Sequence, residues 1–170
     1  MKSKENIVFL GMMGSGKSSI GSLIAKRLKL NFIDIDKEIE KELGASIKKI
    51  FKTKGENYFR KYEEKITLKK LKLNSVVISL GGGAFANKNI RKEVLKDNLS
   101  FWLNWNENIL LNRIKNSKKR PLAFNATDDE LIDLIQKRSY IYSKALYEIK
   151  CDNLSKDKIV KKILKIYETY

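Results

Sequence analysis

The residues with the most specific chemical pattern lie near the amino terminus. Four of them match the pattern G-x-x-x-x-G-K-[ST], namely Gly11, Gly16, Lys17 and Ser18. Glycines allow successive backbone N–H groups to surround a phosphate, a lysine neutralises the terminal phosphates, and a serine hydroxyl can ligate magnesium. A chance match in a chain of this length has a frequency of about one in a hundred or less. The pattern therefore predicts a phosphate-binding loop.

Two carboxylates and two arginines elsewhere in the chain suit a small anionic acceptor. Asp34 and Asp36 end a segment that we predict to be a strand, residues 31–36. Both would then point from one face at its carboxyl end, where open α/β sheets bind ligands. One carboxylate could orient magnesium through water, and the other could accept a hydrogen bond from a substrate hydroxyl. Arg60 and Arg138 can each bind a carboxylate with two hydrogen bonds.

Arg138 has two competing interpretations. It lies on the apolar stripe of a predicted helix that opens with the capping box Thr127–Glu130. A buried guanidinium without a partner is strongly destabilising, so the side chain needs a carboxylate or a phosphate. An internal ion pair and a bound substrate satisfy that requirement equally well.

The composition limits the chemistry further. The 170 residues include no histidine, which excludes Ser-His-Asp and Cys-His catalysis, histidine bases and most zinc sites. Carboxylates, lysines and arginines must therefore carry any reaction. The formal charge of +16 favours anionic partners. The basic residues are spread through every segment, however, and we expect most of them to form a solvated surface.

Cysteine usage and hydropathy bear on where the protein works. The lone Cys151 cannot form an internal disulfide, and we expect it to be inert and half-buried in a reducing compartment. No apolar run approaches the length that crosses a bilayer. We therefore expect a cytoplasmic monomer that binds neither a membrane nor nucleic acid.

The elements that must position these residues alternate between strands and helices. Apolar runs predict five strands, over residues 7–10, 31–36, 76–80, 99–103 and 146–151. Helical periodicity lies between them, with N-caps predicted at Ser46, Asn87, Asn106, Thr127 and Ser155. We predict one domain over residues 1–170, a three-layer α/β/α fold with a five-stranded parallel sheet.

Two segments without periodicity adjoin these elements. Gly81–Gly83 directly follow the third predicted strand, and they indicate close approach of the backbone to a ligand or else a plain flexible turn. Residues 115–127 include the chain's one proline and the three cations at 118–120. We interpret this segment as a lid that closes over phosphates, and the alternative is an ordinary solvated connector.

The sequence resembles the shikimate kinase family over nearly its whole length. Beyond the phosphate loop, the resemblance is carried by motifs in matching order and spacing: Asp34-Ile35-Asp36, Phe59-Arg60-Lys61-Tyr62-Glu63, Leu80-Gly81-Gly82-Gly83-Ala84, Arg120-Pro121-Leu122, and Lys137-Arg138 before Tyr140 and Tyr142. Ser19 and Ala123, where threonine and leucine are usual, depart from the pattern without removing a functional group. The resemblance implies a fold like that of the nucleoside monophosphate kinases, with a substrate-binding helical segment over about residues 34–63.

The resemblance also implies an activity, the transfer of a phosphoryl group from ATP with Mg²⁺ to the 3-hydroxyl of shikimate. It implies catalytic roles for Lys17, Asp36, which would hold the acceptor hydroxyl or act as base, and Arg120, which would close with the lid onto the phosphates. ATP would contact Gly14, Ser15, Gly16, Lys17, Ser18, Ser19, Arg113, Arg120 and Asn153, with Arg113 and Asn153 flanking the adenine. Shikimate would contact Asp36, Arg60, Glu63, Gly81, Gly82, Gly83 and Arg138, with Glu63 supporting the arginines. The metal would be held by Ser18 and, through water, by Asp34.

Two other functions remain open. A related P-loop kinase for gluconate or a nucleotide would need the same loop, and gluconate is also a hydroxylated carboxylate that a pair of arginines would bind. A basic nucleic-acid-binding module with an idle nucleotide site would require aromatic residues interleaved on a basic face. Trp102 and Trp105 instead lie in or beside a predicted buried strand, which disfavours that module.

Overall fold

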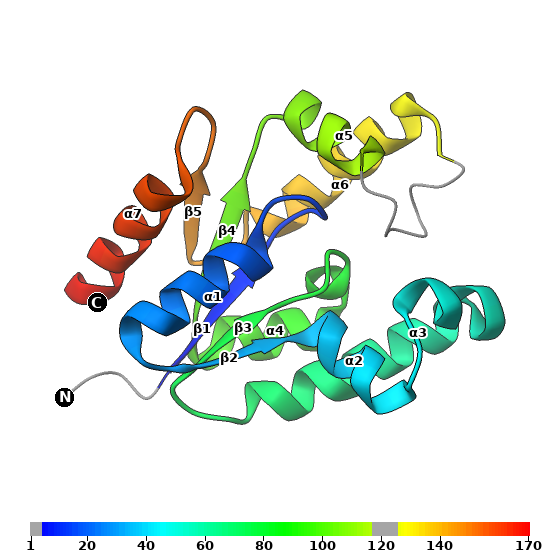
Figure 1. The fold of residues 1–170 in the computed structure, drawn as a ribbon, viewed down its shortest axis with the longest axis horizontal. Coiled ribbons are helices and arrows are strands. Elements are labelled where there is room, and N and C mark those ends of the chain that lie inside the picture. The colour runs from blue at the N-terminus through cyan, green and yellow to red at the C-terminus, as the bar shows by residue number, and fades with distance from the viewer. Residues whose placement is uncertain (1–4, 117–125) are drawn as a thin grey trace.

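A computed structural model describes residues 5–116 and 126–170. Arg120 and most of the predicted lid over residues 115–127 lie outside these described ranges. The described residues form three layers, with helices covering both faces of one sheet (Figure 1). The three-layer α/β/α fold expected from the sequence is therefore confirmed.

Five parallel strands form the sheet in the order β2, β3, β1, β4, β5. Their bounds are β1 (Asn6–Leu10), β2 (Asn31–Asp34), β3 (Val76–Ser79), β4 (Asn98–Asn104) and β5 (Tyr147–Lys150). After β1 the chain builds β2 and β3 on one side, and it then crosses to the other side for β4 and β5. The carboxyl end of β1 is therefore a topological switch point, where open α/β sheets bind ligands.

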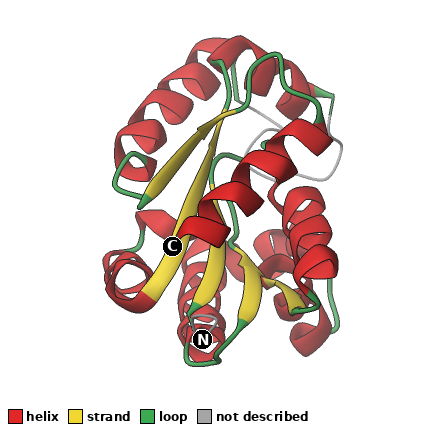
Figure 2. Ribbon diagram, turned by 90° about the vertical axis from the view of Figure 1, so that its left-hand side faces the viewer, coloured by secondary structure: helices red, strands yellow, loops and turns green. Residues whose placement is uncertain are grey.

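The central strand β1 is buried along its whole length and contributes to two separate parts of the core. Val8 and Leu10 belong to one hydrophobic cluster, whereas Ile7 and Phe9 belong to the other. Successive strand residues point to opposite faces, so a continuous apolar run serves both clusters. Figure 2 shows the sheet between its two helical layers.

Two helices pack on the Ile7 and Phe9 face, α1 (Lys17–Leu28) and α7 (Lys156–Thr169). The opposite face carries α2 (Ile35–Leu43), α3 (Ile47–Leu71), the 3₁₀ helix η1 (Ala84–Ala86), α4 (Lys88–Asp97), α5 (Glu107–Lys115) and α6 (Asp128–Tyr142). All five predicted N-caps accept backbone hydrogen bonds at helix starts, and Thr127 with Glu130 forms the complete capping box. Local capping chemistry therefore fixed these boundaries.

The predicted strand over residues 31–36 is wrong in its last two residues. β2 ends at Asp34, whose side chain accepts a hydrogen bond from the Lys37 backbone N at 3.3 Å and caps α2. Asp36 lies in the first turn of that helix, so the two carboxylates do not project from one face of a strand. The alternating apolar pattern suits a strand, but an aspartate N-cap also starts a helix, and here the cap prevails.

Candidate active site

The phosphate loop lies between β1 and α1, as predicted. Gly16 is the N-cap of α1 at φ 91°, a backbone conformation that other residues rarely adopt. A Cβ at Gly11 would lie 3.0 Å from the carbonyl oxygen of Leu103. α1 therefore begins directly at the loop, and its unpaired N–H groups with their partial positive charge favour a phosphate there.

Lys17 is folded back onto the loop. Its Nζ donates to the carbonyl oxygens of Gly11 at 2.9 Å and of Met12 at 3.0 Å, and only 7% of the residue is exposed. Ser15 is buried beside it, and its Oγ has no hydrogen-bond partner within the described ranges. The loop thus holds one ammonium charge against its own carbonyl dipoles.

Asp34 and Ser79 end the neighbouring strands β2 and β3, and Ser18 lies in the first turn of α1. Asp34 pairs with Ser79 in the register of β2 and β3, and the Oγ atoms of Ser79 and Ser18 are 3.5 Å apart. Mg²⁺ bound to nucleotide phosphates takes one or two protein oxygens and keeps several waters. The Ser18 hydroxyl and the Asp34 carboxylate fit that requirement. Within residues 5–116 and 126–170, no cluster of three or more Asp, Glu or Cys side chains could hold a metal by itself.

A cavity of about 270 Å³ lies beside the phosphate loop, lined by Gly14, Ser15, Gly16, Ile20, Trp105, Arg113, Leu154, Lys156 and Ile159. The guanidinium of Arg113 stacks on Trp105, with its Cζ 3.8 Å from the ring centroid. Arg113, which we predicted to contact adenine, therefore lies where a nucleotide base could reach it. Asn153 is exposed and immediately precedes Leu154 in the lining, so its contact with adenine stays a prediction.

On the other side of the loop, Arg60 and Glu63 form an ion pair within α3. Arg60 Nη1 lies 2.7 Å from Glu63 Oε2, and Nη2 lies 3.1 Å from Glu56 Oε1. The Glu63 side chain is 3% exposed. Burial opposes the charge on Arg60, but the two glutamates outweigh it and raise the pKa of Arg60. Burial also raises the pKa of Glu63, against the opposing effect of Arg60. Glu63 therefore pairs with Arg60 at a cost in desolvation, and its support of the arginines in substrate binding stays a prediction.

Glu63 and Asp36 both face Gly81. A Cβ at Gly81 would overlap Glu63 Oε1 and lie 2.9 Å from Asp36 Oδ1. After burial and the effects of Arg60, the nearby Asp36 charge contributes to the raised pKa of Glu63. Glu63 Oε1 is buried and accepts no hydrogen bond from any described residue. A glycine is therefore required where these two carboxylates come together.

Gly82 joins this side of the site to α6 and to the phosphate loop. Its carbonyl oxygen accepts hydrogen bonds from Arg138 Nη1 at 3.4 Å and from the Tyr142 hydroxyl. A Cβ at Gly82 would lie 3.1 Å from the backbone N of Met13, and one at Gly83 would lie 2.7 Å from Arg60 Nη1. The glycines thus leave room for the site's own side chains, and their approach to a ligand stays a prediction.

Arg138 does not form the internal ion pair that was one of its two interpretations. Across the described parts of the chain, no carboxylate lies within 4.0 Å of its guanidinium. Its Nη1 contacts the Gly82 carbonyl and the Met12 Sδ, the latter at 3.7 Å, and the guanidinium also interacts with the Tyr142 hydroxyl. A guanidinium has five N–H donors, so these contacts leave donors that can serve an anion.

Three residues that shape the site were not predicted as site residues. Ser79 is a lone hydroxyl in the apolar run 76–80, Tyr142 closes the motif around Arg138, and Trp105 directly follows the end of β4. A hydroxyl at a strand end was the available signal for Ser79. The hydrogen bonds of Trp105 and Tyr142 connect segments far apart in the sequence, and no local pattern indicated them.

Cys151 is fully buried rather than half-buried, because β5 ends inside the hydrophobic cluster under α1 and α7. Burial, with a smaller contribution from Asp152, raises the pKa of its thiol to about 12. A thiol with this pKa is almost wholly protonated at neutral pH, which agrees with the expected inertness.

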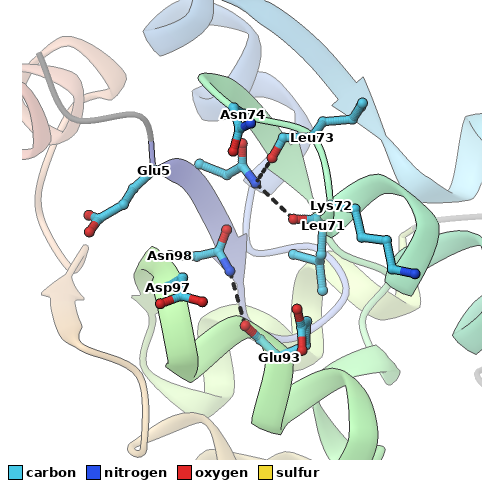
Figure 3. A pocket seen from close by; sticks show the side chains of 9 residues that line it. Glu5, Leu71, Lys72, Leu73, Asn74, Glu93, Asp97 and Asn98 are labelled. Atoms are coloured by element: carbon cyan, nitrogen blue, oxygen red, sulfur yellow. Dashed lines mark hydrogen bonds between the residues drawn. The ribbon is translucent and has the colours of Figure 1, made fainter.

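Another pocket, of about 240 Å³, lies at the amino ends of the strands, away from the phosphate loop (Figure 3). Asn6 Nδ2 donates there to the carbonyl oxygens of Leu71 at 3.1 Å and Leu73 at 2.7 Å. Asn98 Nδ2 donates to the carbonyl oxygen of Glu93 at 3.0 Å. These polar groups fasten the end of α3 and the end of α4 to the sheet, so their role is structural.

None of the helices in residues 5–116 and 126–170 has the length and apolar character that a membrane span needs.

Comparison with known proteins gives a consistent result. The family model described as shikimate kinase matches residues 13–168. A shikimate kinase from Thermodesulfovibrio yellowstonii is 38% identical over 165 residues, which cover 96% of this chain and 95% of that protein.

Solved structures agree with the sequence relatives. A shikimate kinase from Acinetobacter baumannii in complex with shikimate has a TM-score of 0.92 and 29% identity, covering 99% of this chain and 95% of that one. The shikimate kinase from Aquifex aeolicus has a TM-score of 0.85 and 37% identity, covering 96% of each chain. The likeness therefore extends over the sheet and both helical layers.

Proposed function

Because this chain belongs to the shikimate kinase family, we propose that it transfers the γ-phosphoryl group of ATP to the 3-hydroxyl of shikimate, giving shikimate 3-phosphate and ADP. Family membership makes it a phosphotransferase of the shikimate pathway, which leads to the aromatic amino acids. The proposal adds the donor nucleotide, the metal, the position of the acceptor hydroxyl and the roles of individual residues.

One observation carries the proposal: two carboxylates and two arginines converge on Gly81–Gly83 beside the phosphate loop. Gly81 faces Asp36 and Glu63, Gly83 faces Arg60, and the Gly82 carbonyl binds Arg138. Arginine forks suit the carboxylate of shikimate, and the acidic groups suit its hydroxyls. The contact of Gly82 with Met13 keeps this acceptor next to the donor phosphates.

On the donor side, the proposed roles follow from the loop. The N–H groups of Gly14, Ser15 and Gly16 bind the phosphates, together with Ser18 and Ser19 at the start of α1. Lys17 moves from its carbonyl partners to the terminal phosphates, where its charge stabilises the transition state. Ser18 and, through water, Asp34 would hold Mg²⁺, which supplies charge neutralisation to the nucleotide phosphates when it is bound.

On the acceptor side, Asp36 holds the 3-hydroxyl and takes its proton as the new O–P bond forms. Asp36 lies in the first turn of α2, where the partial positive charge of the helix amino terminus favours a carboxylate. Arg60 and Arg138 bind the shikimate carboxylate, and Glu63 keeps Arg60 in place. Arg120, which lies outside the described residues, is proposed from the family resemblance to bind the phosphates with the lid.

A coupled assay of ADP release tests the proposal. Purified protein with MgATP should turn over with shikimate and much more slowly with gluconate or any nucleoside monophosphate, because family membership favours shikimate over those acceptors. NMR of the product should show phosphorus coupled to the proton on carbon 3. The absence of shikimate-dependent ADP release would refute the proposed reaction.

A cytoplasmic location and a monomeric state remain predictions from the sequence. The single buried thiol suits a reducing compartment. Light scattering at the concentrations used in the assay would measure the mass, and a value near 19.7 kDa is expected for a monomer.

A further inference from the structure

The structure links Trp105 to the phosphate loop across 90 positions of sequence. The indole Nε1 donates to the carbonyl oxygen of Ser15 at 2.9 Å. Trp105 is the residue directly after β4, at the same edge of the sheet as the loop that follows β1. Its ring packs against both hydrophobic clusters. The side chain that binds this backbone oxygen of the loop is therefore held in place by packing.

Arg113 hydrogen-bonds to the neighbouring carbonyl of the same loop. Its Nη1 donates to the Gly14 oxygen at 3.3 Å, and its guanidinium lies over the Trp105 ring with 3.8 Å from Cζ to the ring centroid. Stacking of this kind holds an exposed arginine in one orientation. Trp105 therefore fixes one loop carbonyl directly and the other through Arg113.

Holding these two oxygens also sets the direction of loop N–H groups. A trans peptide unit is planar, and its N–H points away from its C=O. The Ser15 carbonyl shares a peptide unit with the Gly16 N–H, and the Gly14 carbonyl shares one with the Ser15 N–H. Holding the Ser15 oxygen against Trp105 therefore sets the direction of the Gly16 N–H, while the Ser15 N–H donates to the Met12 carbonyl oxygen at 3.1 Å and closes a turn of the loop.

Trp105 and Arg113 also line the cavity of about 270 Å³ beside the loop, together with the apolar side chains of Ile20, Leu154 and Ile159. Apolar walls with an aromatic ring and a guanidinium over it suit a nucleotide base. Trp105 therefore hydrogen-bonds to the backbone of the phosphate loop and also lines the cavity beside it.

We propose that Trp105 is a positioning residue for the nucleotide: it preorganises the loop at Gly14–Gly16 and orients Arg113 against the base. The proposal rests on the proposed function only in taking a nucleoside diphosphate or triphosphate as the ligand. Because the residue acts on the donor side, its loss is expected to weaken nucleotide binding and to leave acceptor binding unchanged.

The test is calorimetric titration of the full-length protein with MgADP, with no acceptor present. Trp105→Phe keeps a ring for Arg113 but removes the N–H donor, so the dissociation constant should rise about 3- to 10-fold. Trp105→Leu removes the donor and the stack together, and a rise of about 10- to 100-fold is expected. In steady-state assays the KM for shikimate should change by less than about twofold in both variants.

A second variant tests whether the two side chains act as a unit. Arg113→Met should weaken MgADP binding, and the double variant with Trp105→Leu should lose less than the product of the single losses, because Arg113 acts through its stack on Trp105. Phe101→Leu is the control, since Phe101 is an aromatic residue of β4, the strand that Trp105 follows, and it packs against Phe9 and Tyr147. It should lower the melting temperature and leave MgADP binding unchanged.

The outcomes separate this inference from the proposed reaction. MgADP binding within twofold of wild type in both Trp105 variants, or no MgADP binding by the wild-type protein, would overturn it. A wild-type protein that binds MgADP but does not turn over with shikimate would refute the reaction and leave the role of Trp105 standing.

Discussion

The two halves of the site are held by different parts of the chain. The donor half, residues 11–18 with Trp105 and Arg113, is mostly backbone from one continuous segment. The acceptor half consists of side chains on α2, α3 and α6 around the glycines after β3: Asp36, Arg60, Glu63, Gly81–Gly83 and Arg138. The donor half therefore depends on local conformation, whereas the acceptor half depends on how three helices pack.

Charge is also handled differently in the two halves. The Lys17 ammonium donates hydrogen bonds to two carbonyl oxygens of its own loop. Glu63 is almost fully buried, and one of its oxygens has no described hydrogen-bond partner. The acceptor half thus retains a desolvated carboxylate, and we infer that binding of a hydroxylated anion relieves part of that cost.

The largest loss of turnover is expected for Lys17→Ala, in the donor half. Removal of the ammonium should lower turnover on the order of 10³-fold or more with any acceptor, because no other described group in the loop replaces its charge on the phosphates. ADP release under saturating substrates measures the loss, and circular dichroism should show an unchanged fold. Residual turnover above about a tenth of wild type would contradict the assigned role.

Arg138→Ala should affect the acceptor half alone. A charged hydrogen-bonding group lost from the acceptor corresponds to a fall in kcat/KM for shikimate of about 10- to 100-fold. MgADP binding, measured by titration, should stay within twofold of wild type. Arg138→Lys should recover little, because an ammonium cannot form the two-point contact of a guanidinium. Unchanged kinetics in Arg138→Ala would return this residue to a structural role.

Glu63→Gln tests whether the buried carboxylate of the acceptor half makes stability depend on pH. The pKa of Glu63 is raised above its ordinary value of 4.5, chiefly by burial. The folded protein then holds this proton more tightly than the unfolded chain, so rising pH destabilises the fold between 4.5 and the raised value. The wild-type free energy of unfolding, relative to Glu63→Gln, should fall with pH in that window by at most about 1.4 kcal/mol per unit. Urea titrations at several pH values measure it, and a rise with pH would reverse the assigned sign.

Cys151→Ala should have the smallest effect on turnover. Cys151 lies behind the donor half, since its backbone N donates to the Asn104 oxygen and its own carbonyl accepts from Leu154 of the cavity wall. Kinetic constants should stay within about twofold of wild type. The wild-type thiol, with its pKa raised from 9.0 to about 12, should react about 10³-fold more slowly with a thiol reagent at pH 8 than in urea. Rapid labelling of the native protein would show that this wall opens locally.

Sequence reasoning succeeded where the determining contacts are local. The loop motif, the five N-caps and the apolar runs are each read within a few residues; the loop and the caps appear where expected, and each apolar run contains a strand. It failed at Asp34, where two local signals competed and helix capping ended the strand. It also underestimated the burial of Cys151, because burial depends on the helices packed above the strand.

The contacts between the site residues were harder to predict from the sequence than the identity of those residues. Arg60, Glu63 and Arg138 could be singled out by type and by motif, but the sequence left open whether Arg138 pairs internally. In the structure Arg138 donates to the carbonyl oxygen of Gly82, which is 56 positions away in the sequence. The sequence placed Trp105 only in or beside a buried strand, because its bond to Ser15 exists only once β1 and β4 lie side by side.

The complete burial of β1 also bears on how the domain opens. The phosphate loop starts at the last residues of a strand that is paired on both edges and packed on both faces. We expect the amide hydrogens of a strand in that position to exchange mainly through global unfolding. The strand that precedes the loop should therefore open with the free energy of global unfolding. The helices that carry the acceptor residues pack outside the sheet, and we expect them to open locally at a lower free energy.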